Sequence, residues 1–195
     1  MNWILPLVLG YALGSIPFGL LITRIAGAGD LRSIGSGNIG ATNVLRTGRK
    51  GLAATTLLLD LLKGLAAVLI AAHFWPGFAW LGALGAFLGH CFPVWLGFKG
   101  GKGVATMAGV AFGLAWPVGL AYALTWIGLL LIVRISSVAG MTAAVIAPIA
   151  ALLLGEMQAA GVLAVIAAIV IFQHRENIGR LRAGTEPRVG SGKKP

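Results

Sequence analysis

Long apolar segments separated by short polar loops run along almost the whole chain. A hydrocarbon core about 30 Å thick requires roughly 20 apolar residues in a crossing helix. The sequence supplies such runs at residues 3–25, 52–74, 78–96, 104–133, 138–154 and 157–172. This pattern predicts an all-α fold, a polytopic membrane helix bundle.

The run at residues 104–133 is too long for one membrane span. Trp116 and Pro117 lie near its middle, and a proline favours a helix boundary. We therefore divide this run into two short helices, which brings the predicted number of transmembrane helices to about seven.

The positions of the basic residues test this count. With seven spans, the loops 27–50 and 97–103, the turn at Arg134 and the tail from Arg175 lie on one side of the membrane. These segments and Arg24 contain every Lys and Arg except Lys63. Since basic loops stay in the cytoplasm, we predict the N-terminus out and the C-terminus in.

Composition agrees with a membrane protein. Charged residues make up 10% of the 195 residues, against about 25% in soluble domains, and the hydrophobic share is 58%. The net charge of +10 needs no nucleic acid as partner, because the positive-inside bias explains it. We expect a single integral membrane domain over residues 1–195, with a short disordered tail from about 188.

Some residues inside the predicted spans carry information of their own. Asp60 and Lys63 are three residues apart, so they share a helix face and are expected to form a buried ion pair with each other or with loop residues. Charges within a membrane are also functional candidates by default. Glycines at four-residue spacing predict close helix contacts. These are Gly10 and Gly14, Gly85 and Gly89, and Gly109 and Gly113.

The first polar segment, residues 35–46, contains a G-x-G-x-x-G pattern. That pattern indicates a dinucleotide site only after a strand, and here it lies between membrane helices. What remains is a glycine-rich loop with Ser, Thr and Asn donors followed by Arg46. Such a backbone can approach an anion closely.

The second polar segment, residues 98–106, resembles a phosphate loop but fails the Walker pattern. Leu96 stands where the first glycine belongs, and Gly103 where a magnesium-binding Ser or Thr belongs. ATP binding is therefore not supported. The loop opens a helix, whose N-terminus suits a phosphate, and Lys99 and Lys102 add charge. Positive-inside bias alone is the alternative explanation.

The third polar segment, residues 173–180, continues the last span. If the helix continues, His174 and Asn177 share a face, and Glu176 can pair with Arg180 at i,i+4. A helix C-terminus favours cations, which accounts for the arginines without a function. It does not account for the His and Asn.

Several catalytic patterns are missing from the sequence. The five acidic residues show no metal-ligand spacing, which argues against magnesium-dependent transfer, so we expect neither a metal nor a cofactor. No His is followed four residues later by Asp, as in many acyltransferases. There is no G-x-S-x-G elbow either.

Together, residues 35–46, 89–103 and 174–180 resemble the bacterial acyl-phosphate:glycerol-3-phosphate acyltransferase family, over nearly the whole chain. The resemblance implies transfer of a fatty acyl group from acyl phosphate to the 1-hydroxyl of glycerol 3-phosphate. The product is lysophosphatidic acid, the first committed intermediate of phospholipid synthesis. It also implies a multi-pass protein of the bacterial inner membrane, with its active site at the cytoplasmic face. Membrane lipid surrounds it, and a soluble enzyme that supplies acyl phosphate is a candidate for transient contact.

These expectations assign roles to the polar residues. Lys102 and Arg46 hold phosphate, framed by the loop at 100–103. Ser36 and Asn38 position the acyl phosphate or its oxyanion. His174, beside Asn177, orients the attacking hydroxyl or takes its proton, unless a substrate phosphate is the base. The candidate catalytic residues are His174, Asn177 and Ser36. The candidate substrate-binding residues are Asn38, Thr42, Asn43, Arg46, Lys99, Gly100, Gly101, Lys102, Gly103, Ser137 and Arg175.

Two other classes of function remain open at this point. A transporter or channel for phosphorylated metabolites would suit the basic loops and the intramembrane Asp60 and Lys63. Transporters often contain two related halves, and no internal repeat is visible in the sequence. A structural membrane protein without a substrate would leave His174 and Asn177 unexplained.

Overall fold

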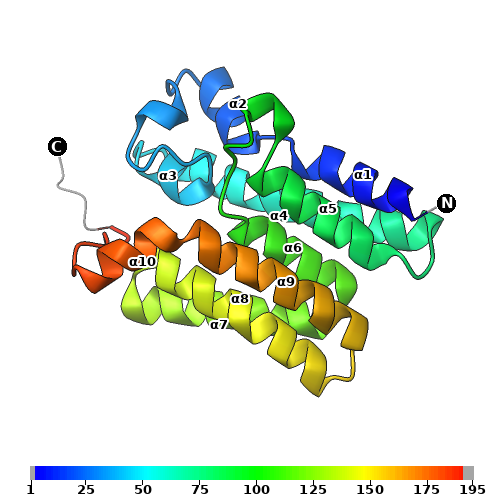
Figure 1. The fold of residues 1–195 in the computed structure, drawn as a ribbon. Helices are drawn as coiled ribbons and strands as arrows, with labels where there is room; N and C mark the ends of the chain where they lie inside the picture. The colour runs from blue at the N-terminus through cyan, green and yellow to red at the C-terminus, as the bar shows by residue number, and fades with distance from the viewer. Residues whose placement is uncertain (1–2, 191–195) are drawn as a thin grey trace.

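The computed structural model describes residues 3–190, and the regular structure within them is helical throughout (Figure 1). The α-helices are α1 (Ile4–Gly14), α2 (Phe18–Ile25), α3 (Ala41–Leu45), α4 (Lys50–Phe74), α5 (Ala79–Cys91), α6 (Val104–Leu114), α7 (Trp116–Val133), α8 (Ser136–Leu153), α9 (Met157–Gln173) and α10 (Arg175–Arg182). Two short 3-10 helices, η1 (Leu31–Ser33) and η2 (Val94–Leu96), lie in the loops. The predicted all-α membrane bundle is confirmed.

Five segments in the described chain are long and apolar enough to cross a membrane. They are Ile4–Ile25, Lys50–Phe74, Ala79–Leu96, Trp116–Val133 and Ser136–Leu153. Helices α9 and α10 count as a sixth if this pair, bent by 56°, is taken as one span. The predicted break at Trp116 is confirmed, but α6 has only 11 residues. The count of seven and the N-out, C-in orientation therefore stay predictions.

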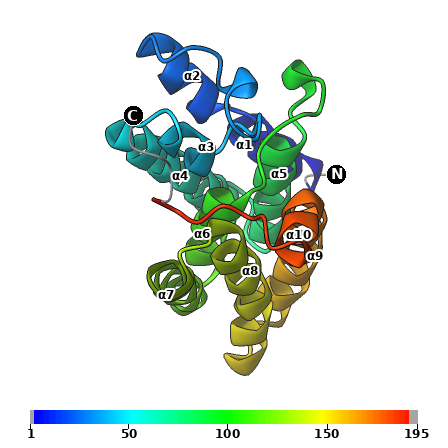
Figure 2. The same cartoon turned by 90° about the vertical axis from the view of Figure 1, so that its left-hand side faces the viewer.

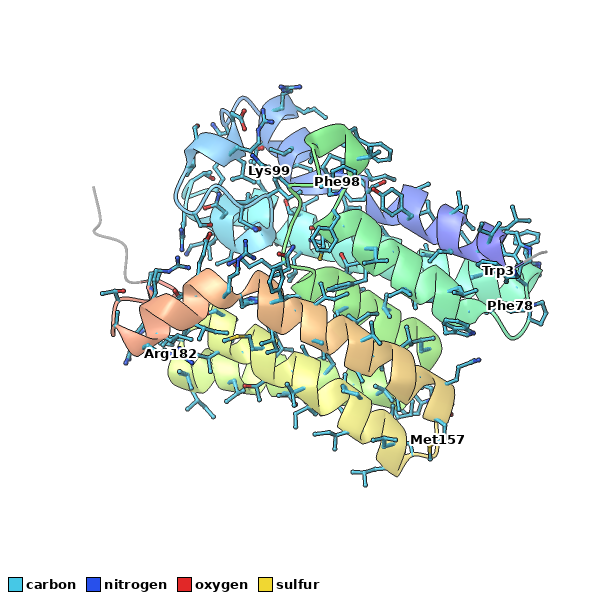
Figure 3. All side chains as sticks on the ribbon, in the orientation of Figure 1. Trp3, Phe78, Phe98, Lys99, Met157 and Arg182 are labelled. Atoms are coloured by element: carbon cyan, nitrogen blue, oxygen red, sulfur yellow. The ribbon has the colours of Figure 1, made fainter. Side chains whose placement is uncertain are left out.

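The polar loops gather at one end of the bundle. In Figure 3, Trp3, Phe78 and Met157 lie at one end, whereas Lys99 and Arg182 lie toward the other. We call this second end, formed by residues 26–49, 94–103, 134–135 and 174–190, the polar end. Figure 2 views the bundle from the polar end and shows the segment after α10 running back across the bundle.

Glycines allow the helices to approach closely. A Cβ added at Gly10 or Gly14 of α1 would overlap a backbone oxygen of α5, and one added at Gly85 or Gly89 of α5 would overlap a backbone oxygen of α1. Gly109 of α6 lies equally close to a carbonyl of α4. The close helix contacts predicted from the glycine spacing are confirmed.

Replacing Gly109 with alanine should destabilise the protein, because the new methyl group overlaps the Leu61 carbonyl oxygen and pushes α4 and α6 apart. Overpacking of this kind costs about 1–3 kcal/mol. Thermal unfolding in detergent should therefore show Gly109→Ala melting several degrees below Gly161→Ala, a control in α9 with open space at its Cβ. Equal melting temperatures would contradict the close contact.

The predicted ion pair between Asp60 and Lys63 is also present. Lys63 Nζ lies 2.6 Å from Asp60 Oδ1, and both side chains are almost completely buried.

Near the C-terminus, Val189 donates its N–H to the carbonyl oxygen of Arg134 at 2.6 Å. Of the predicted disordered tail, residues 191–195 lie outside the described residues.

Candidate active site

An open cleft of about 400 Å³ lies at the polar end. All three polar segments identified in the sequence contribute to its walls. The lining residues are Ser36, Gly37, Asn38, Cys91, Phe92, Phe98, Lys99, Gly100, Gly101, Lys102, Phe172, Gln173, Arg175 and Glu176. Seven of the fourteen predicted site residues, Ser36, Asn38, Lys99, Gly100, Gly101, Lys102 and Arg175, therefore meet at one cleft.

Asn43 shapes the first segment from inside. It is 2% exposed, and its Oδ1 accepts the N–H of Ser36 at 3.1 Å. Its Nδ2 donates to the carbonyl oxygens of Leu31 (3.0 Å) and Ile34 (2.9 Å). These bonds use both amide hydrogens, so Asn43 acts by holding Ser36 in place. The expectation that Asn43 contacts substrate directly does not fit this placement.

Ser36 is presented at the cleft by two left-handed residues, Gly35 (φ +56°) and Gly37 (φ +68°), a conformation that favours glycine. The Arg46 side chain packs beside Gly35, since a Cβ there would lie 2.9 Å from its guanidinium. Asn38 lines the cleft while its Oδ1 accepts the Gly40 N–H at 3.0 Å, just before α3. Arg46 is not among the residues that line the cleft, so its predicted role in holding phosphate stays a prediction.

Thr42 links this segment to another helix of the polar end. Its Oγ1 lies 3.0 Å from the Oγ of Ser136, the first residue of α8. Its predicted role in substrate binding stays a prediction, since Thr42 is not among the residues that line the cleft.

The second segment contains residues 99–103, which we call the glycine loop. The Gly100 N–H donates to the Cys91 carbonyl oxygen at 3.1 Å, and the Gly101 N–H donates to that of His90 at 3.0 Å. These carbonyls belong to the last turn of α5, where no helical N–H follows to pair with them. Both N–H groups are therefore used within the protein, and the predicted roles of Gly100 and Gly101 in binding phosphate stay predictions.

The glycine loop also determines where α6 begins. Gly103 has a left-handed φ of +81°, and a Cβ there would overlap the Phe87 ring. Lys102, between the inward-facing Gly101 and the start of α6, is therefore the residue of the loop best placed to meet an anion. The helix N-terminus that follows it adds positive potential.

The third segment contacts Lys102 through a hydrogen-bonded cluster. Lys102 Nζ donates to Asn177 Oδ1, and Asn177 Nδ2 donates to Glu186 Oε1 at 2.5 Å. Ser137 Oγ also donates to Glu186 Oε1 at 2.6 Å, and Arg180 Nε donates to Glu186 Oε2 at 2.6 Å. The Glu186 carboxylate thus joins α8, α10 and the glycine loop.

Glu186 was not predicted from the sequence. Its side chain is only 6% exposed, although the residue follows α10 in a basic tail. The predicted pairing of Glu176 with Arg180 is wrong, because Arg180 bonds Glu186 and Glu176 lines the cleft. The one available signal was a single acidic residue within a basic segment.

Two pKa shifts describe the electrostatics of this cluster. Burial alone would raise the pKa of Glu186, but hydrogen bonds from Ser137, Asn177 and Arg180 outweigh it and hold that pKa below its usual range. Burial and the charge of Arg180 lower the pKa of Lys102. An anion bound in the cleft would therefore stabilise the Lys102 cation.

His174 lies at the bend between α9 and α10 and is 3% exposed. Its Nδ1 lies 2.8 Å from the carbonyl oxygen of Val170. A carbonyl can only accept, so Nδ1 carries the proton and Nε2 has a free lone pair. Its neighbours Gln173 and Arg175 line the cleft, and Gln173 Nε2 also donates to the Gly101 carbonyl oxygen at 3.4 Å. The predicted role of His174 as base stays a prediction.

Burial lowers the pKa of His174 from 6.5 to about 4. Between pH 6.5 and 4, His174 is protonated in the unfolded chain but neutral in the folded chain, which favours unfolding. The contribution of His174 to the free energy of unfolding is therefore complete above pH 6.5 and is lost as the pH falls toward 4. The full loss corresponds to about 3 kcal/mol. The melting temperature of His174→Gln should fall less between pH 6.5 and 4 than that of the native chain or of the exposed control His73→Gln. Parallel curves would contradict the buried neutral imidazole.

Within residues 3–190 the structure contains no group of three or more His, Cys, Asp or Glu side chains that could hold a metal ion. The described site offers cations, amides, hydroxyl groups, the carboxylates of Glu176 and Glu186, and the imidazole of His174. These groups can bind phosphate, orient a hydroxyl group and accept a proton.

Comparisons with known proteins agree on one family. The family model described as glycerol-3-phosphate acyltransferase matches residues 4–184. A glycerol-3-phosphate acyltransferase of Novosphingobium aromaticivorans is 70% identical over 97% of this chain and 96% of its own length. Another from Mesorhizobium japonicum is 64% identical over 96% of each chain.

Solved structures give the same result. The crystal structure of PlsY, an integral membrane glycerol 3-phosphate acyltransferase, in its glycerol 3-phosphate form superposes with a TM-score of 0.92. The two share 40% sequence identity, over 98% of this chain and 97% of that one. Its lysophosphatidic acid form superposes with a TM-score of 0.89 at 38% identity, with the same coverage.

Proposed function

The chain belongs to the glycerol-3-phosphate acyltransferase family, and we propose that its acyl donor is acyl phosphate and its acceptor the 1-hydroxyl of glycerol 3-phosphate. The products are lysophosphatidic acid and inorganic phosphate. The observation that carries this proposal is the single cleft in which Lys99, Lys102 and Arg175 lie beside three phenylalanines. Such a cleft suits two phosphate-bearing substrates, one of which has an acyl chain.

The apolar part of the cleft supports a lipid donor. Phe92, Phe98 and Phe172 line it, and the latter two are each 60% exposed. Phenylalanine rings offer a large apolar surface against which an acyl chain can pack. An acyl chain can therefore lie among the helices while its phosphate remains at the polar end.

In the proposed reaction, the 1-hydroxyl oxygen attacks the carbonyl carbon of acyl phosphate. A C–O bond forms, the negative charge develops on the carbonyl oxygen, and the bond from the carbonyl carbon to the phosphate oxygen then breaks. Acyl phosphate already carries a good leaving group, so no covalent enzyme intermediate is needed. The groups of the cleft orient the two reactants and stabilise the developing charge.

We assign the phosphate of glycerol 3-phosphate to Lys102, with Arg46 and the glycine loop around it. Ser36 and Asn38, which also line the cleft, position the acyl phosphate. The hydroxyl proton passes either to His174 Nε2 or to an oxygen of the acyl phosphate, and both acceptors satisfy the proton balance. Asn177 supports Lys102 through its side-chain hydrogen bond.

The same proposal places the protein in the bacterial inner membrane with the polar end in the cytoplasm. The basic residues of that end support this orientation. Both glycerol 3-phosphate and a soluble enzyme that makes acyl phosphate can reach the cleft from that side. No metal or cofactor takes part.

The donor is tested with purified protein in detergent or lipid, given glycerol 3-phosphate and either palmitoyl phosphate or palmitoyl-coenzyme A, without added metal. We expect lysophosphatidic acid from palmitoyl phosphate alone. Product from palmitoyl-coenzyme A alone would overturn the proposed donor. No product from either donor, in protein shown to be folded, would also overturn acyl phosphate as the donor.

A further inference from the structure

A buried charged cluster lies directly beneath the cleft. Asp60 and Lys63 come from α4, and His90 comes from the last turn of α5; they are 3%, 5% and 4% exposed. Besides its ion pair with Asp60, Lys63 Nζ donates to the Ile16 carbonyl oxygen at 2.8 Å, in the break between α1 and α2. The cluster therefore connects three membrane segments.

A cluster of this kind is not explained by stability alone. Burying an ion pair costs desolvation energy, and well-packed apolar residues in its place are often equally stable or more so. Charges within a membrane are more costly still and mark functional positions. The contacts of His90 indicate what such a function is.

His90 contacts the glycine loop in two ways. Its carbonyl oxygen accepts the Gly101 N–H at 3.0 Å. Its ring lies so close under Gly101 that a Cβ on that residue would overlap His90 Nε2. The His90 imidazole thus packs directly against Gly101, and Lys102 is the next residue in the chain.

The other side of the ring faces Asp60. His90 Nδ1 lies 3.7 Å from Asp60 Oδ1 and has no hydrogen-bond partner within the described residues. The Asp60 carboxylate, which Lys63 holds in place, is therefore the charged group that faces this nitrogen and can orient the ring.

We propose that His90 is a positioning residue for the glycine loop, and that the ion pair of Asp60 with Lys63 holds the His90 ring beneath Gly101. The cluster acts through the loop and touches no substrate. The cluster fixes the position of the Gly101 backbone, and thereby the position of Lys102 in the cleft. This inference rests on the proposed function of Lys102 as the site for the phosphate of glycerol 3-phosphate.

The main test replaces the ion pair by apolar residues of similar size, Asp60→Leu with Lys63→Met. The melting temperature should be unchanged or higher, because no charge is left unpaired. The KM for glycerol 3-phosphate should nevertheless rise about tenfold, since the ring is no longer held and the phosphate site shifts. An unchanged KM in the folded pair variant would overturn the proposal, since a purely structural role predicts that result.

A second test asks whether Asp60 acts through His90. His90→Leu should also raise the KM for glycerol 3-phosphate, whereas the control His73→Leu, in the last turn of α4, should not. Adding His90→Leu to the apolar pair should give no further rise beyond His90→Leu alone. Multiplied effects would contradict the proposed route through the ring.

The single substitution also keeps the inference testable if the pair variant fails to fold. His90→Leu leaves the ion pair intact, and an unchanged KM in this variant would overturn the proposal. The proposed donor and the proposed role of His90 are tested by different results. A native chain that is inactive with acyl phosphate refutes the donor. The KM for glycerol 3-phosphate, which tests the role of His90, can be measured with whichever donor is active.

Discussion

Lys102→Met should lower kcat/KM for glycerol 3-phosphate by about 1,000-fold, because removing the cation that pairs with the substrate phosphate costs about 2–5 kcal/mol. Lys102 lies between the glycine loop and α6, lines the cleft and donates to Asn177. Methionine keeps the length of the side chain and removes the charge, so that packing is largely conserved. Steady-state kinetics with purified protein in detergent give the measurement.

The matched control for this variant is Lys50→Met, which removes an exposed lysine at the start of α4, also at the polar end. Its kcat/KM should equal that of the native chain. If both variants lose the same modest amount of activity, then net positive charge at this end, rather than Lys102 itself, attracts the substrate.

Gly101→Ala should reduce kcat/KM by about 100-fold, the cost of a misplacement near 1 Å in an active site. The added methyl group overlaps the His90 ring, which is buried and cannot move aside, so the loop must rise and carry Lys102 with it. The hydrogen bond from the Gly101 N–H to the His90 carbonyl oxygen is lost or stretched.

Gly128→Ala in α7 is the control for the added methyl group, since nothing lies within 4 Å of a Cβ at that position. It should retain native activity and a native melting temperature. A Gly101→Ala protein with native kcat/KM would show that the loop tolerates displacement, and would contradict the contact between Gly101 and His90 as a constraint on the site.

Three features determined by local sequence were predicted correctly. Trp116 and Pro117 marked the division of an overlong apolar run because a proline restricts the residue before it, and α7 begins at Trp116. The glycines of α1 and α5 face each other because four-residue spacing places them on one helix face. Asp60 and Lys63 pair for the same reason.

Features determined by distant segments were not predicted. The direction of the Gly100 and Gly101 N–H groups depends on which carbonyls are left unpaired at the end of α5, and this follows only from how the loop folds back. Asn43 looks like a substrate donor in the sequence, yet it faces the carbonyls of its own loop. Glu186 reaches Ser137, 49 residues away in the chain, only because the tail crosses the polar end.

The number of membrane spans also could not be predicted from the sequence, because it depends on how α6 packs in the bundle. Helix α6 is apolar but has only 11 residues, about 16 Å of helix, which is half the thickness of the hydrocarbon core. Glycines bring it against α4, so that it sits within the bundle beside longer helices. Periodicity and length in the sequence do not distinguish this short packed helix from a short span.

The proposed function requires that one cleft, built from residues 35–46, the glycine loop and residues 173–186, binds glycerol 3-phosphate. The decisive measurement is a crystal structure of this protein grown with glycerol 3-phosphate. We expect phosphate density about 3 Å from Lys102 Nζ, with the glycerol part directed toward Ser36. Phosphate bound elsewhere, with the cleft at Lys102 containing only solvent, would contradict it.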